Sequence, residues 1–241
     1  MSNALPILIV QTGRTHAHIR ERLGDFDDWI AAGLREGGAE VLTHDAQGDQ
    51  ALPPLHSLAG IVLTGSHAMV SDREPWSEAL VPWLQQAVAQ SVPTLGICYG
   101  HQLLAHALGG EVTHHPQGVE IGTVQVQRHA QADGDALLGH LPPSFDAQAV
   151  HWQTVRRLPP EAVALASNAH EPHHAFRMGT RAWGVQFHPE FSGESLRAYL
   201  EGLGPTLARE GRDAAQISAA VKDTPEAASV LATFARLAQP Q

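Results

Sequence analysis

The sequence predicts an α/β fold in which helices cover both faces of a mostly parallel central sheet. Apolar runs of strand length alternate with amphipathic runs of helix length through the first half, a pattern typical of strand–helix–strand units. The segments between about Glu111 and His188 are then rich in β-formers, which indicates antiparallel additions to the sheet. From Gly193 onward, Ala, Leu and Arg dominate, and two or three helices are expected as a C-terminal tail.

The elements of the first half have clear start and stop signals. Gly37 and Gly38 end one helix, and Pro75 suits the first turn of another. Strands are expected over 6–12, 41–44, 60–64 and 94–97, and helices over 26–36, 75–90 and 99–108. This order is typical of the doubly wound, flavodoxin-like arrangement.

The polar segments Thr12–Arg14 and Gly24–Trp29 are expected to form a loop that leads into the first of these helices. Asp25 or Asp27 is expected to cap that helix. The alternative is that Arg14 or Arg20 helps to recognise an acceptor or a substrate. The chain of 241 residues is expected to be a single domain over 1–241, with a core at about 5–195 and a C-terminal helical extension at about 193–239.

Charge and hydropathy exclude several classes of function. The formal net charge is −10, and Arg156–Arg157 is the only basic pair, so a nucleic-acid partner is not expected. No run of about 18 apolar residues is present, so no membrane partner is expected. The only lysine, Lys222, follows no glycine-rich loop, which excludes a P-loop. No cofactor is expected, and any ATP-dependent step would need another chain.

The chain has one cysteine, Cys98, and cannot form an internal disulfide, so a reducing, cytoplasmic location is expected. Cys98 falls between a predicted strand and a predicted helix, in the sequence Gly96-Ile97-Cys98-Tyr99-Gly100. This G-x-C-x-G pattern has the form of a nucleophile elbow with sulfur in place of oxygen. The helix N-terminus favours a thiolate. The alternative is an ordinary buried cysteine, and a second feature is needed to decide.

That second feature is the segment Val185–Glu190, which reads VQFHPE. A thiolate nucleophile needs a base that moves a proton, and the base needs a group that orients it. His188 ends an apolar strand, and Glu190 follows two residues later. Pro189 has a restricted φ and can hold the two side chains in a defined turn. His188 is therefore the candidate base among sixteen histidines.

Residues 96–102 (GICYGHQ) and VQFHPE together resemble the paired signatures of the class I, triad-type glutamine amidotransferases, most closely stand-alone GMP-synthase-like members. The resemblance covers roughly residues 5–195. It implies that Cys98 attacks the side-chain amide of glutamine, forms a γ-glutamyl thioester and releases ammonia. It also implies that His188 is the general base and acid, and that Glu190 orients it.

The same resemblance implies the remaining site residues. The oxyanion hole would use the backbone N–H of Tyr99 and the turn Gly65–Ser66, where Ser66 replaces the second glycine of the family pattern. The expected substrate-binding residues are Gln102, His151 and Trp152. In the loop Val150–Gln153 only His151 agrees with the family pattern, so Trp152 and Gln153 are places where the choice of γ-glutamyl group can change.

Three functions remain open at this stage. The first is a glutaminase that releases ammonia for a separate ATP-dependent synthetase. The second is a freestanding hydrolase of γ-glutamyl peptides or amides, and the third is a binding module that kept the fold. The histidine pairs His114–His115 and His173–His174 lack the spacing of a metal site, so no metal is expected and they are interpreted as solvated or loop residues.

Overall fold

The computed structural model describes residues 5–239 and confirms the predicted fold class. Within these residues, five parallel strands stand side by side: β2 (Val41–Asp45), β1 (Ile7–Gln11), β3 (Gly60–Leu63), β4 (Thr94–Ile97) and β11 (Ala182–Val185). Four antiparallel strands extend the sheet beyond β11: β10 (Ala175–Met178), β9 (Val163–Ser167), β6 (Glu120–Arg128) and β7 (Ser144–His151). A separate ribbon pairs β5 (Glu111–His114) with β8 (Gln153–Arg157).

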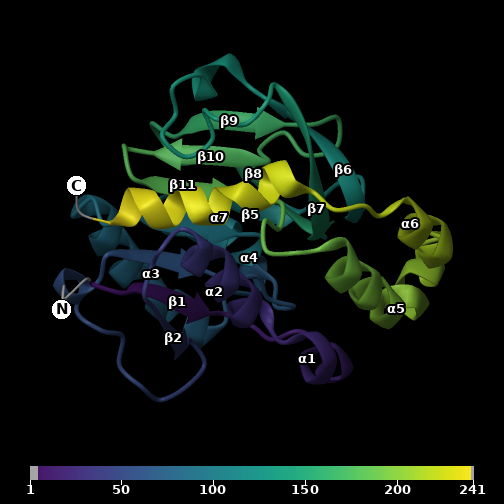
Figure 1. The fold of residues 1–241 in the computed structure, drawn as a ribbon, viewed down its shortest axis with the longest axis horizontal. Helices are drawn as coiled ribbons and strands as arrows, with labels where there is room; N and C mark the ends of the chain where they lie inside the picture. The colour runs from purple at the N-terminus through teal and green to yellow at the C-terminus, as the bar shows by residue number, and fades with distance from the viewer. Residues whose placement is uncertain (1–4, 240–241) are drawn as a thin grey trace.

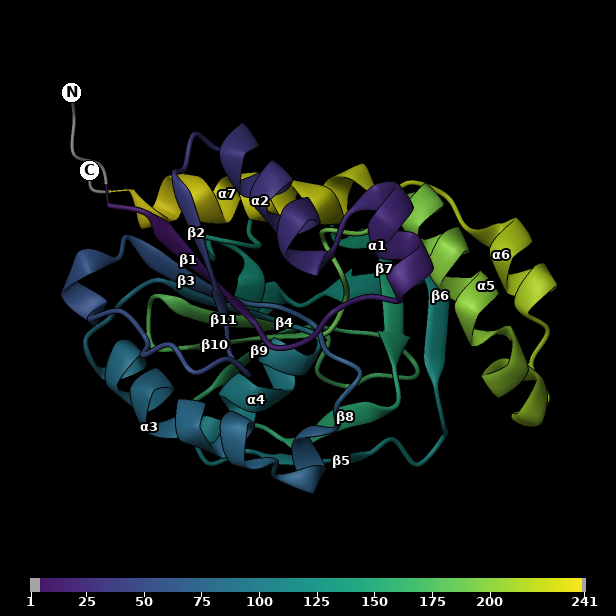
Figure 2. The same cartoon turned by 90° about the horizontal axis from the view of Figure 1, so that it is seen from below.

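Helices cover both faces of the parallel part of the sheet. Figure 2 shows α2 (Phe26–Glu36) and α7 (Pro225–Ala238) on one face and α3 (Pro75–Ala89) and α4 (Tyr99–Ala107) on the other. Alternate side chains of β1 enter two different cores: Ile9 packs in the same cluster as Leu34 of α2, and Val10 in the same cluster as Leu103 of α4. Both faces of β1 are therefore buried, which explains its continuous apolar run.

One helix was not expected from the sequence. Residues 17–23 form α1 (Ala17–Leu23), a stretch for which the sequence predicts no element. Only Ile19 of α1 is buried, so the helix carries almost no apolar periodicity. The predicted cap of the next helix is confirmed, because the Asp25 carboxylate accepts hydrogen bonds from the backbone N–H groups of Thr15 and Phe26.

The C-terminal part contains α5 (Gly193–Arg209), α6 (Ala214–Ala220) and α7. In Figure 1, α5 and α6 lie to the side of the sheet, beyond β7, and α7 returns across the sheet beside α2. The packing of α7 is tight, since a Cβ on Gly37 would lie 2.5 Å from the Cβ of Ala235. Three short 3₁₀ turns complete the description: Leu55–Ser57, Val70–Asp72 and Ala130–Ala132. Over the described residues, no helix has the length and apolar character needed to cross a membrane.

Candidate active site

Cys98 lies at the carboxyl end of β4, where the backbone turns sharply into α4. Its φ and ψ are 51° and −102°, a region that residues other than glycine rarely adopt. The flanking glycines allow strand and helix to approach closely. A Cβ on Gly96 would lie 2.3 Å from the carbonyl oxygen of Gly100, and a Cβ on Gly100 would lie 2.5 Å from the Cβ of Leu63. The G-x-C-x-G pattern is thus a requirement of packing at this turn.

His188 and Glu190 follow β11, the parallel neighbour of β4, so the two segments emerge at the same edge of the sheet. His188 Nδ1 donates a hydrogen bond of 2.7 Å to Glu190 Oε1, and both side chains are buried. The Phe191 ring stacks on the imidazole at a centroid distance of 4.3 Å. The backbone of His188 also bridges to Gln148 on β7. These contacts fix the imidazole ring in one orientation.

The charge state of His188 follows from its neighbours. Burial lowers the pKa of this imidazole. The negative charges of Glu190 and Cys98 and the hydrogen bonds to both raise the pKa by more than burial lowers it, to about 10. His188 is therefore protonated at neutral pH in this arrangement. Cys98 Sγ also lies 3.6 Å from the carbonyl oxygen of Val150, so the sulfur is next to the end of β7.

The expected oxyanion groups lie beside the sulfur. Tyr99 is the first residue of α4, where the backbone N–H has no carbonyl of a preceding helical turn to bind. The turn after β3 carries Gly65 and Ser66. A Cβ on Gly13 would lie 2.5 Å from Ser66 Oγ, so the missing side chain of Gly13 makes room for the serine. Ser66 Oγ accepts a hydrogen bond from the N–H of Ala68, which stabilises the turn despite the departure from two glycines.

If glutamine is hydrolysed at Cys98, as the family resemblance implies, Gly65→Ala should lower kcat by about tenfold or more, because small displacements of reacting groups are costly. The new Cβ would lie 3.1 Å from Cε1 of His188 and 3.8 Å from the Cβ of Cys98, so the imidazole must shift. The matched control is Gly204→Ala, because a Cβ at Gly204 meets no atom within 4 Å. Equal kcat values for the two variants, with unchanged thermal unfolding, would contradict this steric account.

A cavity of about 170 Å³ opens above the sulfur, and it brings together several of the predicted residues. Cys98, Tyr99, Ser66, Gln102, His151 and Trp152 all line it, whereas Gly65, His188 and Glu190 do not. The Gln102 amide is held in place, since its Nε2 donates to the carbonyl oxygen of Gln153 and to Gln186 Oε1, both at 2.9 Å. The cavity therefore has one polar side, built from α4 and the β7–β8 turn.

His151 connects this cavity to a buried acidic group. Its Nε2 lies 2.9 Å from Glu120 Oε2, and its Nδ1 lies 2.9 Å from the carbonyl oxygen of Gln153. Glu120 also lies 3.0 Å from His174 Nε2 and accepts a hydrogen bond from Asn168. Burial raises the pKa of Glu120, but the hydrogen bonds and charges of His151 and His174 lower it more, to well below its ordinary value. Glu120 thus holds His151 in the orientation that shapes the β7–β8 turn.

We expect Glu120→Gln to reduce the free energy of unfolding at pH 7 by about 3 kcal/mol, since removing one member of a buried charged network is costly. The depressed pKa means that the carboxylate stabilises the fold above its unfolded pKa, and that this contribution is lost as the pH falls through the folded pKa. The difference between wild type and variant should therefore shrink below about pH 4.5. Urea unfolding measures the free energy of unfolding, and the control is Glu40→Gln, since Glu40 is exposed. A loss of stability at pH 7 in Glu120→Gln no larger than that in the control would refute the role of the buried carboxylate.

Several residues of the cavity were missed by the sequence reasoning. They are His16, His67, Ala68, Met69, Tyr199 and Leu203, whereas Val150 and Gln153 belong to the predicted substrate-binding loop. His67 follows the predicted oxyanion turn directly, and its position was a usable signal. Tyr199 and Leu203 lie one turn apart on α5, far along the chain from the motifs, and nothing local in the sequence ties that helix to Cys98.

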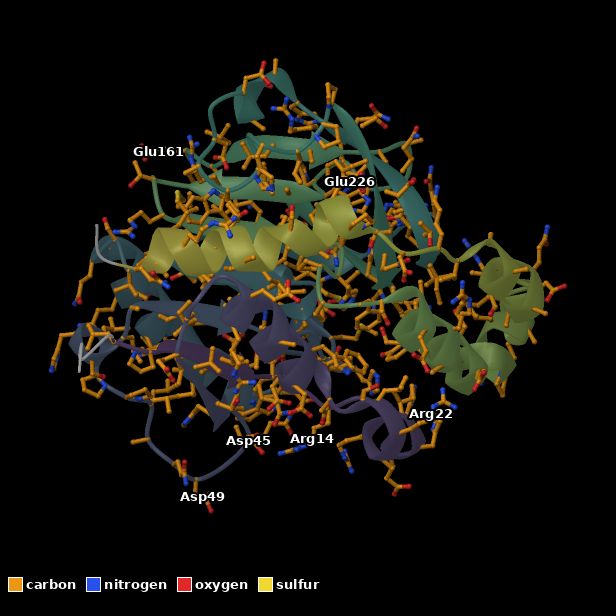
Figure 3. All side chains as sticks on the ribbon, in the orientation of Figure 1. Arg14, Arg22, Asp45, Asp49, Glu161 and Glu226 are labelled. Carbon is orange, nitrogen blue, oxygen red and sulfur yellow. The ribbon has the colours of Figure 1, made fainter. Side chains whose placement is uncertain are left out.

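The remaining predicted features lie apart from this cavity. His115 and His174 lie in loops, as one of the two predicted alternatives has it, although both are buried, and His114 is exposed. Over residues 5–239, no group of three or more His, Cys, Asp or Glu side chains has an arrangement suited to a metal ion. Arg14 reaches Asp45 at 3.0 Å on the surface, and Figure 3 shows these two side chains next to one another.

Comparisons with known proteins agree with the geometry. The family model for class-I glutamine amidotransferases matches residues 23–201. A glutamine-hydrolyzing GMP synthase of Aeropyrum pernix is 35% identical over 228 residues, which are 90% of this chain and 40% of that protein. A γ-glutamyl-L-1-hydroxyisopropylamide hydrolase of a Pseudomonas species is 31% identical over 177 residues, which are 66% of this chain and 56% of that protein. The chain therefore spans only part of the length of these relatives.

Two solved structures share the fold. A glutamine amidotransferase from Thermotoga maritima aligns with a TM-score of 0.74 over 97% of this chain and 96% of that chain, at 21% identity. A glutamine amido transferase from Methylobacillus flagellatus aligns with a TM-score of 0.72 over 97% and 92%, at 24% identity. The family match over residues 23–201 includes both the elbow and the VQFHPE segment. The chain belongs to the class-I glutamine amidotransferase family.

Proposed function

We propose that this protein hydrolyses the side-chain amide of glutamine through a thioester on Cys98 and releases ammonia. One observation carries the proposal. A cysteine at a strained strand–helix turn faces a buried His188–Glu190 pair that emerges from the neighbouring parallel strand. The residue types, their order and their placement at the carboxyl edge of the sheet suit nucleophilic catalysis with an oriented base.

In the first half of the reaction, the Cys98 thiolate attacks the amide carbon of glutamine. The resulting oxyanion binds the backbone N–H of Tyr99 and of the Gly65–Ser66 turn. His188, which is protonated at neutral pH, gives its proton to the amide nitrogen. The C–N bond breaks, ammonia leaves, and a γ-glutamyl thioester remains on the sulfur.

In the second half, neutral His188 takes a proton from a water molecule that attacks the thioester carbonyl. The tetrahedral intermediate collapses, the C–S bond breaks and glutamate leaves. The thiolate and the imidazolium are restored, so the net reaction is glutamine plus water to glutamate plus ammonia. Glu190 keeps Nδ1 protonated throughout, which leaves Nε2 as the nitrogen that exchanges the proton.

The thioester chemistry suits two functions, which differ in what receives or forms the nitrogen product. In the first, an ATP-dependent synthetase on another chain consumes the ammonia released from glutamine, which the likeness to a glutamine-hydrolyzing GMP synthase supports. In the second, the protein acts alone as a hydrolase of γ-glutamyl amides. The likeness to a γ-glutamyl-L-1-hydroxyisopropylamide hydrolase favours this alternative, as does a cavity bordered by Tyr199 and Leu203 from this chain's own α5.

The test measures ammonia, amine and glutamate released by the purified chain from glutamine and from γ-glutamyl amides. We expect ammonia and glutamate from glutamine in equal amounts. Unassisted turnover of γ-glutamyl amides at a rate comparable to glutamine would refute an obligate synthetase partner. Glutaminase activity that appears only when a synthetase is added would refute the freestanding hydrolase. Absence of turnover under both conditions would refute the proposed chemistry.

A further inference from the structure

The cavity above Cys98 is closed on one side by residues that lie outside all the sequence motifs. His16 comes from the start of α1, His67 from the turn after β3, and Tyr199 and Leu203 from α5. The Tyr199 hydroxyl is hydrogen-bonded to His67 Nε2. The His16 ring lies 4.7 Å from that of His67 and 5.3 Å from that of Tyr199. Three separate segments are thus packed into one aromatic wall.

The position of α5 is fixed close to α1. A Cβ on Gly202 would lie 3.1 Å from Cδ2 of His16, so the backbone of α5 nearly touches the imidazole. Tyr199 is buried, and it belongs to a cluster with Phe26 and Phe191. Leu203 lies one turn further along the same face of α5 and borders the cavity. The wall is therefore a packed part of the fold.

A second contact fixes the far end of this helix. Trp152 Nε1 donates a hydrogen bond of 2.9 Å to the carboxylate of Glu210, the residue that follows α5. At its other end, α5 starts directly after Phe191 and Ser192, next to Glu190. The helix of 17 residues, about 25 Å long, therefore runs from the His188–Glu190 segment to the turn that carries Trp152.

The two sides of the cavity differ in polarity. Gln102, Gln153 and the backbone of the β7–β8 turn offer polar groups on the α4 side, whereas Met69, Trp152 and Leu203 offer apolar surface. Within the described part of the chain, the residues that border the cavity include no Lys, Arg, Asp or Glu. The pKa of His16 is lowered by burial and by His18, and that of His67 by desolvation and by His16, so both rings are neutral at pH 7.

The size and polarity of the cavity limit which amine can leave from a bound γ-glutamyl amide. The cavity of about 170 Å³ is smaller than the ~300–1,000 Å³ typical of sites for drug-sized ligands. On the α5 side, a carboxylate on the leaving group would lie against the apolar surface of Met69, Trp152 and Leu203 with no cation beside it, which is costly. An apolar group larger than a few carbon atoms would collide with Leu203 or force Trp152 away from Glu210.

We propose that Leu203 and the Trp152–Glu210 contact restrict this enzyme to γ-glutamyl amides whose leaving group is ammonia or a small uncharged amine. This rests on the proposed thioester chemistry and names its substrate class. The polar side of the cavity holds the γ-glutamyl group, and the α5 side surrounds the departing nitrogen and its substituent. γ-Glutamyl peptides, whose leaving groups carry a carboxylate, are poor substrates.

The experiment compares kcat/KM for five substrates: glutamine, γ-glutamylethylamide, γ-glutamylbenzylamide, γ-glutamylglycine and its uncharged analogue γ-glutamylglycinamide. For the wild type, we expect the ethylamide to lie within about tenfold of glutamine, and the benzylamide and γ-glutamylglycine to lie at least about 100-fold below it. γ-Glutamylglycinamide should exceed γ-glutamylglycine by about tenfold or more, because the two differ in charge and hardly in size.

Two variants test whether Leu203 and Glu210 restrict the size of the leaving group. Leu203→Ala and Glu210→Ala should each raise the benzylamide-to-glutamine ratio of kcat/KM by about tenfold, and leave the ratio of γ-glutamylglycine to its amide unchanged. The matched control is Glu201→Ala, because Glu201 is exposed on the same helix and does not border the cavity. Unchanged ratios in both variants, or wild-type turnover of the benzylamide and γ-glutamylglycine within threefold of glutamine, would overturn the restriction alone. Failure to hydrolyse any of the five compounds would overturn the thioester chemistry itself.

Discussion

Replacing Cys98 with alanine will lower glutaminase activity by at least about 10⁴-fold, because no other group at the elbow can form the thioester. Cys98 is the only cysteine in the sequence, so no neighbouring thiol can substitute for it. The side chain is small and almost buried, at 7% exposed, and alanine fills most of its volume. We therefore expect the variant to remain folded, with a thermal unfolding temperature within a few degrees of wild type.

The control for this variant is Cys98→Ser, which keeps a hydroxyl at the same place. A serine hydroxyl is a far weaker nucleophile than a thiolate at neutral pH, so this variant should also lose at least about 10³-fold in kcat. Both variants should still bind glutamine, which equilibrium dialysis can measure. Glutamine hydrolysis by Cys98→Ala at the wild-type rate would refute the proposed mechanism.

Replacing Glu190 with glutamine will lower kcat/KM by about 10³-fold, because the imidazole loses the group that orients it and stabilises its charge. The carboxylate is the first of the causes that raise the pKa of His188 against the effect of burial. Without it, the pKa of His188 falls. The alkaline limb of the pH profile, which we expect near pH 10 for the wild type, should then move to lower pH.

Stability gives an independent readout of the same group. The pKa of His188 in the folded protein, about 10, lies above the ordinary histidine value of 6.5. Its contribution to the free energy of unfolding is therefore fully present below about pH 6.5 and is lost as the pH rises towards 10. In Glu190→Gln this loss should be smaller. The control is Glu21→Gln, an exposed residue of α1. An unchanged alkaline limb in Glu190→Gln would contradict the role of Glu190.

Much of the fold was predictable because its local signals agree with its packing. The buried strands β1, β3 and β4 are continuous apolar runs, and α2 and α3 have capping residues or a first-turn proline that mark their starts. The helix α1 was missed because a single buried side chain, Ile19, stabilises it through tertiary contacts with α5 and the aromatic cluster. Such contacts join segments far apart in sequence and leave no periodic pattern.

The site also contains residues that the sequence could predict and residues that it could not. Cys98, His188 and Glu190 are carried by two short motifs, each placed at the end of a predicted strand, and the parallel pairing of β4 with β11 brings them to one edge. Tyr199, Leu203 and Glu210 could not be predicted, because their relation to the cavity depends on where α5 lies. The buried contact of His151 with Glu120 depends likewise on the pairing of β6 with β7.

The most direct test of the central claim is to look for the γ-glutamyl thioester on Cys98. Glutamine is mixed with the enzyme, the reaction is stopped with acid within the first turnover, and intact-protein mass spectrometry is followed by peptide mapping. We predict an adduct with the mass of glutamine minus ammonia, located on the peptide that contains Cys98 and absent from Cys98→Ser. Hydrolysis of glutamine with no adduct at any quench time, or an adduct on another residue, would contradict the account.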